Sequence, residues 1–267
     1  ALRPRWSRHL RASDCIIGGA GGGVITSSWL PVAVASERAV ARTVGGARMF
    51  FGLGPAAPGP PPEARAGALL SALAPDLGAL RWGRQIHGRR ILAVGGSPGH
   101  GWAESACAGP CDGLVTAACG LGLMVWTADC VPVLMAGDGA VAAVHAGWRG
   151  CAADIVGVAL RLLEAEHGVA ATRLAVALGP AISGPAYPVG PEVVDALNRL
   201  GGDASGWNDE GRVDLRAFLA ARLAALGVAP QRIERVGPCT ASTPGLASFR
   251  RDGTAAGRQW SLVYRPR

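Results

Sequence analysis

The stretch "TADCVPVLMAGDGAVAAVHAGWRG", residues 127–150, contains two apolar runs, "VPVLMA" and "AVAAVH", on either side of the turn sequence "GDG". Two short apolar runs separated by such a turn are typical of an antiparallel β-hairpin with a two-residue loop. One cysteine, Cys130, and one histidine, His145, lie at the outer ends of the two runs. The predicted hairpin therefore brings a thiol and an imidazole together at its open end.

The register of this hairpin decides how close Cys130 and His145 lie. A loop of Gly137 and Asp138 places them directly opposite each other, with Cβ atoms about 5 Å apart. A loop of Asp138 and Gly139 shifts the pairing by two residues and leaves them diagonal neighbours. Three interpretations fit such a pair: two ordinary core residues, a nucleophile with its general base, or two ligands of a zinc or copper ion.

A metal site needs a third ligand, and His87 is the best candidate among the other histidines. His87 lies in "RQIHGRR", next to a glycine and just before a predicted strand. His167 ends a predicted helix, where an imidazole complements the helix dipole. His9 lies in the basic N-terminal segment, and His100 lies in the predicted loop "GSPGHGW". Three protein ligands would leave an open fourth position, which is typical of a catalytic zinc.

The composition argues against nucleic acids and membranes as partners. The chain has 267 residues, a formal charge of +7, no lysine and only 5% aromatic residues. Its arginines are scattered and are not interleaved with aromatic side chains, so no base-stacking surface is predicted. Because no run of 18 or more apolar residues occurs, we expect no membrane-spanning helix. The absence of lysine also excludes a Walker-type lysine and Schiff-base chemistry.

Cysteine usage bears on the cellular compartment. The seven cysteines show no disulfide framework, which in a chain of this length favours a reducing, cytoplasmic location. Export is the alternative interpretation, because residues 1–14 are basic, residues 15–35 are apolar, and "AVA" at 33–35 resembles a signal-peptidase site. Glycines and "TSS" at 26–28 interrupt that apolar segment, so we expect the cytoplasmic location.

Apolar periodicity predicts alternating strands and helices along the chain. Helices are expected at 61–74, 151–168, 190–202 and 214–227, the last with Asp214 as its N-cap. Besides the hairpin, strands are expected at 89–96, 113–126, 173–180 and 232–237. This order predicts an α/β or α+β fold with mixed sheets covered by helices. No repeat or domain boundary is visible, so we expect one domain over 1–267.

Several motifs resemble those of the bacterial laccase-domain family, whose members are often called polyphenol oxidases and are assigned purine nucleoside phosphorylase activity. The matching runs occur in family order: "QIHG", "DGLVT", "TADCVPVLMA", "AVHAGWRG", "LGPAISGPAYPVG" and "SFRRDGTAAGRQ". They span residues 85–259, whereas residues 1–50 match poorly. The pair "TADCVPVL" and "AVHAGWRG" is the most specific part of the resemblance.

The resemblance implies a layered α/β/β/α arrangement of mixed sheets in a single domain and a metal site of His87, Cys130 and His145. It also implies a zinc-dependent enzyme that takes a nucleoside and phosphate. The implied reactions are phosphorolysis of adenosine, inosine or methylthioadenosine, and deamination of adenosine. The alternatives are a copper-dependent polyphenol oxidase, a cysteine-type hydrolase, a protein that edits peptidoglycan precursors, and a degenerate member without catalysis.

Three further residues receive roles from this implied chemistry. The candidate phosphate clamps are Arg149 in "GWRG" and the neighbours Arg250 and Arg251 in "FRRDG", and of these Arg149 and Arg251 are expected to bind phosphate. Asp129, next to Cys130, is expected to shuttle protons in a deamination. The chain also departs from the family pattern: Ala20 or Gly21 replaces an arginine that is usual near the start, a loss that bears on phosphate binding. The paired cysteines and the glutamate usual before "VG" are absent from "GPAYPVG".

Overall fold

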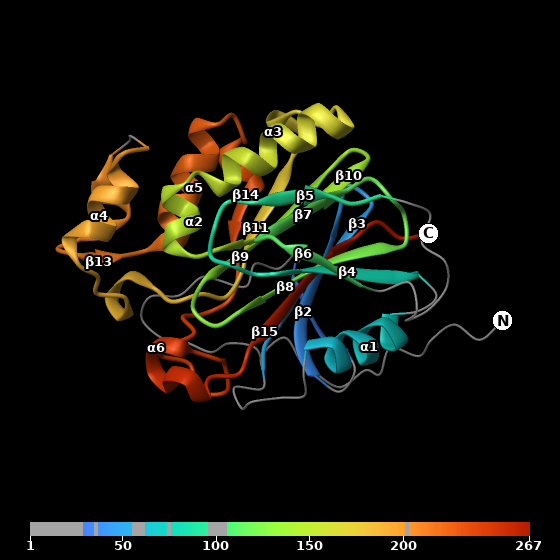
Figure 1. Ribbon diagram of the computed structural model, residues 1–267, viewed down its shortest axis with the longest axis horizontal. Helices are drawn as coiled ribbons and strands as arrows, with labels where there is room; N and C mark the ends of the chain where they lie inside the picture. The colour runs from blue at the N-terminus through green and yellow to red at the C-terminus, as the bar shows by residue number, and fades with distance from the viewer. Residues whose placement is uncertain (1–28, 35–36, 55–61, 74–75, 96–105, 201–202) are drawn as a thin grey trace.

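The computed structural model describes residues 29–34, 37–54, 62–73, 76–95, 106–200 and 203–267. Within these ranges two large mixed β-sheets pack face to face, and helices cover both outer faces (Figure 1). This confirms the α/β/β/α arrangement that the resemblance implies. The departure at Ala20 or Gly21, the basic segment of the export interpretation, and His9 and His100 lie outside the described residues.

The first sheet joins the beginning and the end of the described chain. Strands β1, β2, β3, β15 and β8 form an antiparallel series in that order, whereas β4 pairs parallel with both β8 and β6. In sheet order the strands are β1 (Leu30–Val34), β2 (Glu37–Val44), β3 (Ala47–Gly52), β15 (Gln259–Tyr264), β8 (Leu121–Thr127), β4 (Ala79–Arg84) and β6 (Ala106–Pro110).

The second sheet has the predicted hairpin at its centre. Strands β11, β9, β10 and β7 are antiparallel, and a parallel strand is added at each edge. In sheet order the strands are β14 (Ile233–Arg235), β11 (Ala175–Leu178), β9 (Val131–Gly137), β10 (Ala140–Ala146), β7 (Gly113–Thr116) and β5 (Ile91–Ala93). A small separate ribbon consists of β12 (Asn208–Asp209) and β13 (Arg212–Val213).

The hairpin forms with Asp138 and Gly139 as its loop, so the first of the two registers considered is wrong and the second is confirmed. His145 pairs with Pro132 rather than with Cys130. The loop position explains the choice, because Gly139 has φ of 97°, a conformation in which any other L-residue is strained. Cys130 directly precedes β9, two residues before the partner of His145, and is therefore its diagonal neighbour.

Helices cover the outer faces unequally. Helix α1 (Pro62–Leu73) packs on the first sheet, whereas α3 (Ile155–His167) and α5 (Leu215–Ala225) pack on the second (Figure 1). The remaining α-helices are α2 (Trp148–Ala152), α4 (Pro191–Asn198) and α6 (Phe249–Asp252). The 3-10 helices are η3 (Ala171–Arg173), η4 (Gly184–Ala186), η5 (Ala204–Gly206), η6 (Pro230–Arg232) and η7 (Gly253–Ala255).

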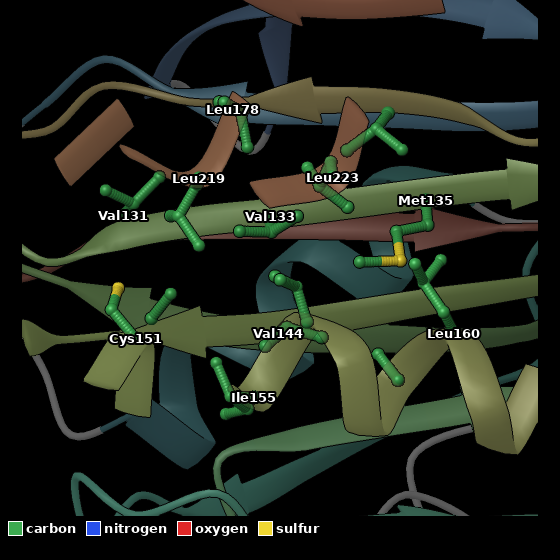
Figure 2. Close-up of a cluster of buried hydrophobic side chains, with 14 of the residues drawn as sticks. Val131, Val133, Met135, Val144, Cys151, Ile155, Leu160, Leu178, Leu219 and Leu223 are labelled. Carbon is green, nitrogen blue, oxygen red and sulfur yellow. The ribbon is translucent and has the colours of Figure 1, made fainter. Parts of the chain in front are cut away.

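The central hairpin is buried on both faces. Val133 and Val144 point toward α3 and α5, where they meet Ile155 and Leu219 (Figure 2). Leu134, on the opposite face of β9, packs between the two sheets. Each such side chain contributes about 1.5–3 kcal/mol when fully buried. Burial on both faces explains the nearly continuous apolar runs in the sequence and gives the residues at the hairpin's open end a rigid support.

The prediction of one helix at 151–168 is wrong at its start. The chain forms α2, which begins at Trp148, and then α3, which begins at Ile155. Asp154 between them has φ of 59°, which interrupts the helical backbone. Its carboxylate accepts two hydrogen bonds from Arg222 of α5, at 2.9 and 3.0 Å. The break is therefore fixed by a contact with a distant helix, which periodicity cannot predict.

Strand prediction failed mainly near the start of the described chain. The expected strand at 113–126 is two strands, β7 and β8, which belong to different sheets. Strands β2 and β3 were not predicted, although Gly45 and Gly46 between them both have positive φ and form a two-residue hairpin signal. Residues 30–34, part of the apolar segment in the export interpretation, form strand β1.

No helix in the described ranges is both long enough and apolar enough to cross a bilayer.

Candidate metal centre

Three predicted side chains meet at one point beside the hairpin. His87, Cys130 and His145 each offer one ligand atom, and these atoms lie within 4.8 Å of one another. The two imidazole rings are perpendicular, with centroids 4.8 Å apart. His145 is buried, Cys130 is half-buried and His87 is exposed. This group, called the ligand trio below, therefore runs from the interior of the protein to its surface.

A fully buried carboxylate, Asp112, arranges the two histidines. One carboxylate oxygen lies 2.9 Å from Nδ1 of His145 and also accepts a hydrogen bond from the backbone N–H of His87, at 2.9 Å. The other oxygen accepts from the backbone N–H of Gly88 at 2.7 Å. With Nδ1 of His145 donating to Asp112, its Nε2 is left to face Cys130. Outer carboxylates of this kind fix the tautomer of metal-binding histidines.

Asp112 was missed by the sequence reasoning. It directly precedes β7 in "CDGLVT", where an aspartate is an ordinary turn residue. Its partners lie 24 to 33 residues away along the chain. Its only local signal is that it is a charged residue at the edge of a buried strand. Despite burial, which by itself raises the pKa of a carboxyl, hydrogen bonds from His145 and from the backbone of Gly88 lower the pKa of Asp112.

The segment that carries His87 is held at both ends. Gln85 exchanges two hydrogen bonds with the backbone of Trp126, at 2.7 and 2.8 Å. Backbone N–H groups of Ile86 and His87 both donate to Asp112. These bonds keep His87 at φ of 57°, a left-handed conformation that costs about 1 kcal/mol or more for a residue with a side chain. The exposed position of His87 is thus a fixed one.

The thiol of Cys130 is strongly influenced by the two imidazoles. Burial raises its pKa, but hydrogen bonds and charges from His145 and His87 outweigh burial and lower the pKa to about 6. Conversely, burial lowers the pKa of His145, and its contacts with Asp112 and Cys130 outweigh that effect and raise it. Cys130 is therefore a thiolate at neutral pH, and the thiolate is the form that binds metals and attacks electrophiles.

The structure leaves space for an ion beside the trio because residue 147 is a glycine. A Cβ atom on Gly147 would lie 3.1 Å from Sγ of Cys130, 3.3 Å from Cδ2 of His87 and 3.9 Å from Cε1 of His145. Its backbone is extended, with φ of −80°, so glycine is not required there for conformation. One thiolate and two imidazoles form a donor set that suits zinc or copper. The residues present therefore fit a bound metal ion.

Asp129, predicted as a proton shuttle, is occupied by structural contacts. Its two carboxylate oxygens accept hydrogen bonds at 2.6 Å, from the hydroxyl of Thr240 and from the backbone N–H of Arg250. Its own carbonyl accepts from the backbone N–H of Ile182 at 3.0 Å. Asp129 has φ of 83° and lies next to Cys130. The structure thus places it where it fixes the turn that presents the Cys130 thiol.

The two predicted phosphate clamps differ in how much of each side chain is free. Arg149, exposed on the first turn of α2, has its guanidinium 4.4 Å from the ring of Trp148. Arg251 donates to both carboxylate oxygens of Asp252. Its Nη1 and Nη2 also donate to carbonyls of the loop at 240–246, at 2.6–3.3 Å. Arg251 therefore shapes this loop, whereas Arg149 has no carboxylate partner among the described residues.

Comparison with known proteins places this architecture in a family. The family described as multi-copper polyphenol oxidoreductase laccase matches residues 63–266. A purine nucleoside phosphorylase of Corynebacterium glutamicum is 37% identical over 188 residues, which cover 68% of this chain and 73% of that protein. A purine nucleoside phosphorylase of Mycobacterium bovis is 38% identical over 187 residues, which cover 68% of this chain and 71% of that protein.

Solved structures show the same fold. The hypothetical protein YfiH of Bacillus licheniformis has a TM-score of 0.73 at 22% identity, covering 85% of this chain and 96% of that one. YlmD from Geobacillus stearothermophilus has a TM-score of 0.70 at 27% identity, covering 91% of this chain and 97% of that one. The likeness thus extends well beyond the region around the ligand trio.

Proposed function

The chain belongs to the multi-copper polyphenol oxidoreductase laccase family, and from that premise we propose that it is a zinc-dependent purine nucleoside phosphorylase. The observation that carries the proposal is the meeting of the His87, Cys130 and His145 ligand atoms within 4.8 Å. The names of its relatives in Corynebacterium and Mycobacterium support the substrate class. In this proposal the substrates are a purine nucleoside, namely adenosine, inosine or methylthioadenosine, and inorganic phosphate.

The ligand trio would hold the ion through one sulfur and two nitrogen atoms. A zinc held this way would supply a Lewis acid that could polarise a substrate oxygen. Asp112 orients His145 and anchors the backbone of His87, so the two imidazoles keep their geometry. Gly147 keeps the adjoining space clear of side-chain atoms. The exposure of His87 gives the substrate access from that side.

Phosphorolysis balances without an oxidant or reductant. A phosphate oxygen forms a bond to C1′ of the ribose, and the C1′–N9 bond breaks with its electron pair going to the purine. The purine takes up the proton that the phosphate loses, and the products are the free base and ribose 1-phosphate, or 5-methylthioribose 1-phosphate when the substrate is methylthioadenosine. The proposal needs cations near the trio for the phosphate, and Arg149 has its charge available for this task, whereas Arg251 acts by holding the loop at 240–246.

We place adenosine deamination and phenol oxidation below phosphorolysis. Deamination needs a carboxylate that exchanges protons with the substrate, and both oxygens of Asp129 already accept hydrogen bonds from Thr240 and Arg250. Oxidation of phenols with four-electron reduction of oxygen ordinarily uses several coppers, and the trio offers ligands for one ion. A copper ion in the trio remains the alternative to zinc.

A cysteine-type hydrolase is a second candidate, favoured by one specific observation. The imidazole of His145 lies between the carboxylate of Asp112 and the thiol of Cys130. The pKa of Cys130 is lowered to about 6. This is the arrangement of an activated nucleophile. The two candidates make opposite demands, because a metal-bound thiolate is not free to attack a substrate. Metal should therefore inhibit a hydrolase and activate a phosphorylase.

Elemental analysis combined with a purine-release assay tests the proposal. Protein purified without added metal should contain about one zinc per chain, as expected for a three-ligand site. It should release purine base from adenosine or inosine only when phosphate is present, with ribose 1-phosphate as the second product. His145→Ala should lose both zinc and activity while its circular dichroism spectrum stays unchanged.

Each other result identifies a different function. Undiminished zinc in His145→Ala would refute the ligand assignment. Ammonia release without phosphate would indicate a deaminase, and oxygen uptake with phenols would indicate an oxidase. Ester or amide hydrolysis that is abolished by thiol alkylation and by zinc would indicate the cysteine-type hydrolase. A metal-loaded protein with none of these activities would indicate a degenerate member.

A further inference from the structure

Arg250 and Tyr187 form a pair of side chains beside the ligand trio that the proposed function has not used. The Arg250 guanidinium carbon lies 4.9 Å from the centroid of the Tyr187 ring. Arg250 donates its backbone N–H to Asp129, which directly precedes Cys130. The Tyr187 ring therefore lies against a residue that is hydrogen-bonded to the immediate neighbour of Cys130.

Both side chains are held in place by the backbone around them. Tyr187 follows η4; its N–H donates to the carbonyl of Gly184 at 2.9 Å, and its carbonyl accepts from Val213 at 3.1 Å. Arg250 is fixed at its backbone by Asp129 and at its side chain by Nη1, which donates to the carbonyl of Pro188 at 3.0 Å. The pair is thus preorganised, which lowers the entropic cost of binding a ligand.

The pair carries donors and a positive charge that the described residues leave unsatisfied. Nε and Nη2 of Arg250, and the hydroxyl of Tyr187, have no hydrogen-bond partner in the described part of the chain. Nor does Arg250 form an ion pair there, unlike its neighbour Arg251, which pairs with Asp252. An exposed guanidinium with two nitrogens, Nε and Nη2, free to donate beside a phenol suits a tetrahedral oxyanion.

We propose that Arg250 and Tyr187 form the subsite that holds the phosphate cosubstrate next to the metal centre. This inference rests on the proposed function and adds to it the residues that bind the anion. The Tyr187 hydroxyl is a phenol, which is protonated at neutral pH, and it donates to a phosphate oxygen. Arg250 supplies the positive charge that offsets the anion beside the Cys130 thiolate.

The assignment differs from the expectation for Arg251 in a way that follows from the contacts. The two arginines are adjacent in the sequence, yet the guanidinium of Arg251 donates to Asp252 and to carbonyls of the loop at 240–246. The guanidinium of Arg250 donates only one hydrogen bond, from Nη1 to the carbonyl of Pro188. The donors available to a phosphate therefore belong to Arg250, and those of Arg251 keep the loop that carries the Asp129 partner Thr240 in place.

Binding of inorganic phosphate to the zinc-loaded, full-length chain tests the subsite without turnover. Calorimetry on the wild type should show phosphate binding that weakens about ten- to a hundredfold in Arg250→Met. Tyr187→Phe should weaken it about three- to tenfold, because one neutral hydrogen bond is lost. Arg250→Met keeps the backbone N–H that Asp129 accepts. The matched control is Arg161→Met, whose side chain is 63% exposed on α3 and which should bind phosphate as the wild type does.

Steady-state kinetics provide the second readout. In Arg250→Met the KM for phosphate should rise by the same factor as the dissociation constant, while the KM for inosine and the zinc content stay within about twofold of the wild type. Unchanged phosphate affinity in both Arg250→Met and Tyr187→Phe would overturn the subsite. So would a rise in the phosphate KM of Arg149→Met that Arg250→Met does not share.

The outcomes separate this inference from the proposed function. If the wild type catalyses phosphorolysis and Arg250→Met does not change the KM for phosphate, the subsite is overturned and the proposed phosphorylase is not. Phosphate binding that depends on Arg250, in a wild type that releases no purine base, would support the subsite as an oxyanion site and overturn the proposed phosphorylase. If Arg250→Met loses zinc, Tyr187→Phe, which leaves Asp129 and its contacts untouched, decides the question.

Discussion

The open end of the β9–β10 hairpin and the apolar layer beneath α3 each hold a thiol, one half-buried and one buried, and the two thiols differ sharply. Cys130, at the open end, has its pKa lowered to about 6 because His145 and His87 outweigh the effect of burial. Cys151, 1% exposed, lies among apolar side chains of α2 and the second sheet (Figure 2), and burial raises its pKa above the ordinary range. The cysteines have the same side chain, so the difference comes from their neighbours.

This contrast shows that the middle and the open end of the hairpin in the second sheet have different roles. The middle of the hairpin contributes apolar contacts on both faces, and those contacts hold the strand ends still. The open end adds one buried carboxylate, Asp112, and through it a fixed imidazole. Burial alone makes a thiol inert, whereas burial beside oriented imidazoles makes it a ligand or nucleophile.

Exchanging each thiol for a hydroxyl should have the largest and most selective effect. Cys130→Ser should weaken zinc binding by more than the roughly 10–100-fold that loss of an outer hydrogen-bond partner costs. Cys151→Ser should leave zinc affinity unchanged and lower the free energy of unfolding by about 1–3 kcal/mol, because a hydroxyl is then buried in an apolar layer. Competition with a zinc chelator and chemical denaturation measure the two quantities. Comparable zinc loss in both variants would contradict the different roles given to Cys130 and Cys151.

Removing the charge of Asp112 should have the next largest effect. Asp112→Asn keeps the size of the side chain but weakens its hold on His145 and on the backbone N–H groups of His87 and Gly88. Zinc affinity should fall about 10–100-fold. Asp138→Asn, at the exposed loop at the other end of the hairpin, is the control and should bind zinc normally. An unchanged zinc affinity in Asp112→Asn would show that the carboxylate charge is not needed to orient the two histidines.

Alkylation of the metal-free protein measures the thiol contrast directly. A group with a pKa near 6 is largely thiolate at pH 8 and largely thiol at pH 5, so the rate of Cys130 modification by iodoacetamide should fall about tenfold over that range. Cys151 should stay unmodified throughout, and zinc should protect Cys130. Peptide mass spectrometry gives both rates. A Cys130 rate that keeps rising above pH 8 would show an unperturbed thiol.

The smallest effect is expected from a single methyl group over the trio. Gly147→Ala places a Cβ atom 3.1 Å from Sγ of Cys130, a contact that a small shift can relieve. Zinc affinity should fall only about three- to tenfold, in proportion to the slight displacement of the ligands. Gly206→Ala is the control, since nothing lies within 4 Å of its added Cβ. A variant that binds zinc as tightly as the wild type would place the ion on another side of the trio.

The parts of the molecule that local sequence determines were predicted well. The central hairpin, the helices at 62–73, 191–198 and 215–225, and the Asp214 N-cap follow from periodicity and turn signals over a few residues. The convergence of Cys130 and His145 also follows, because one tight turn brings them together. The third member, His87, was found by elimination and matches the family motif "QIHG".

The features that failed depend on contacts between distant segments. Asp112 bonds to residues on both sides of it that are far away in sequence. The break before α3 depends on Arg222, 68 residues from Asp154. Apart from its neighbour Asp252, the acceptors of Arg251 are backbone carbonyls, which exist at every position and leave no mark in a sequence. Such contacts are set by the packing of the sheets and helices, so no local pattern reports them.

The first sheet has a consequence for how the protein is made. Strand β15 lies between β3 and β8, and the indole of Trp260 donates to Glu37, 223 residues earlier in the chain. A nascent polypeptide therefore carries β1 to β3 with one edge of their hydrogen-bonding groups unpaired until β15 has been made. Sheet completion waits until β15 emerges from the ribosome, and pairing over such long sequence separations is slow. During synthesis, the β3 edge is therefore open to mispairing and to recognition by chaperones.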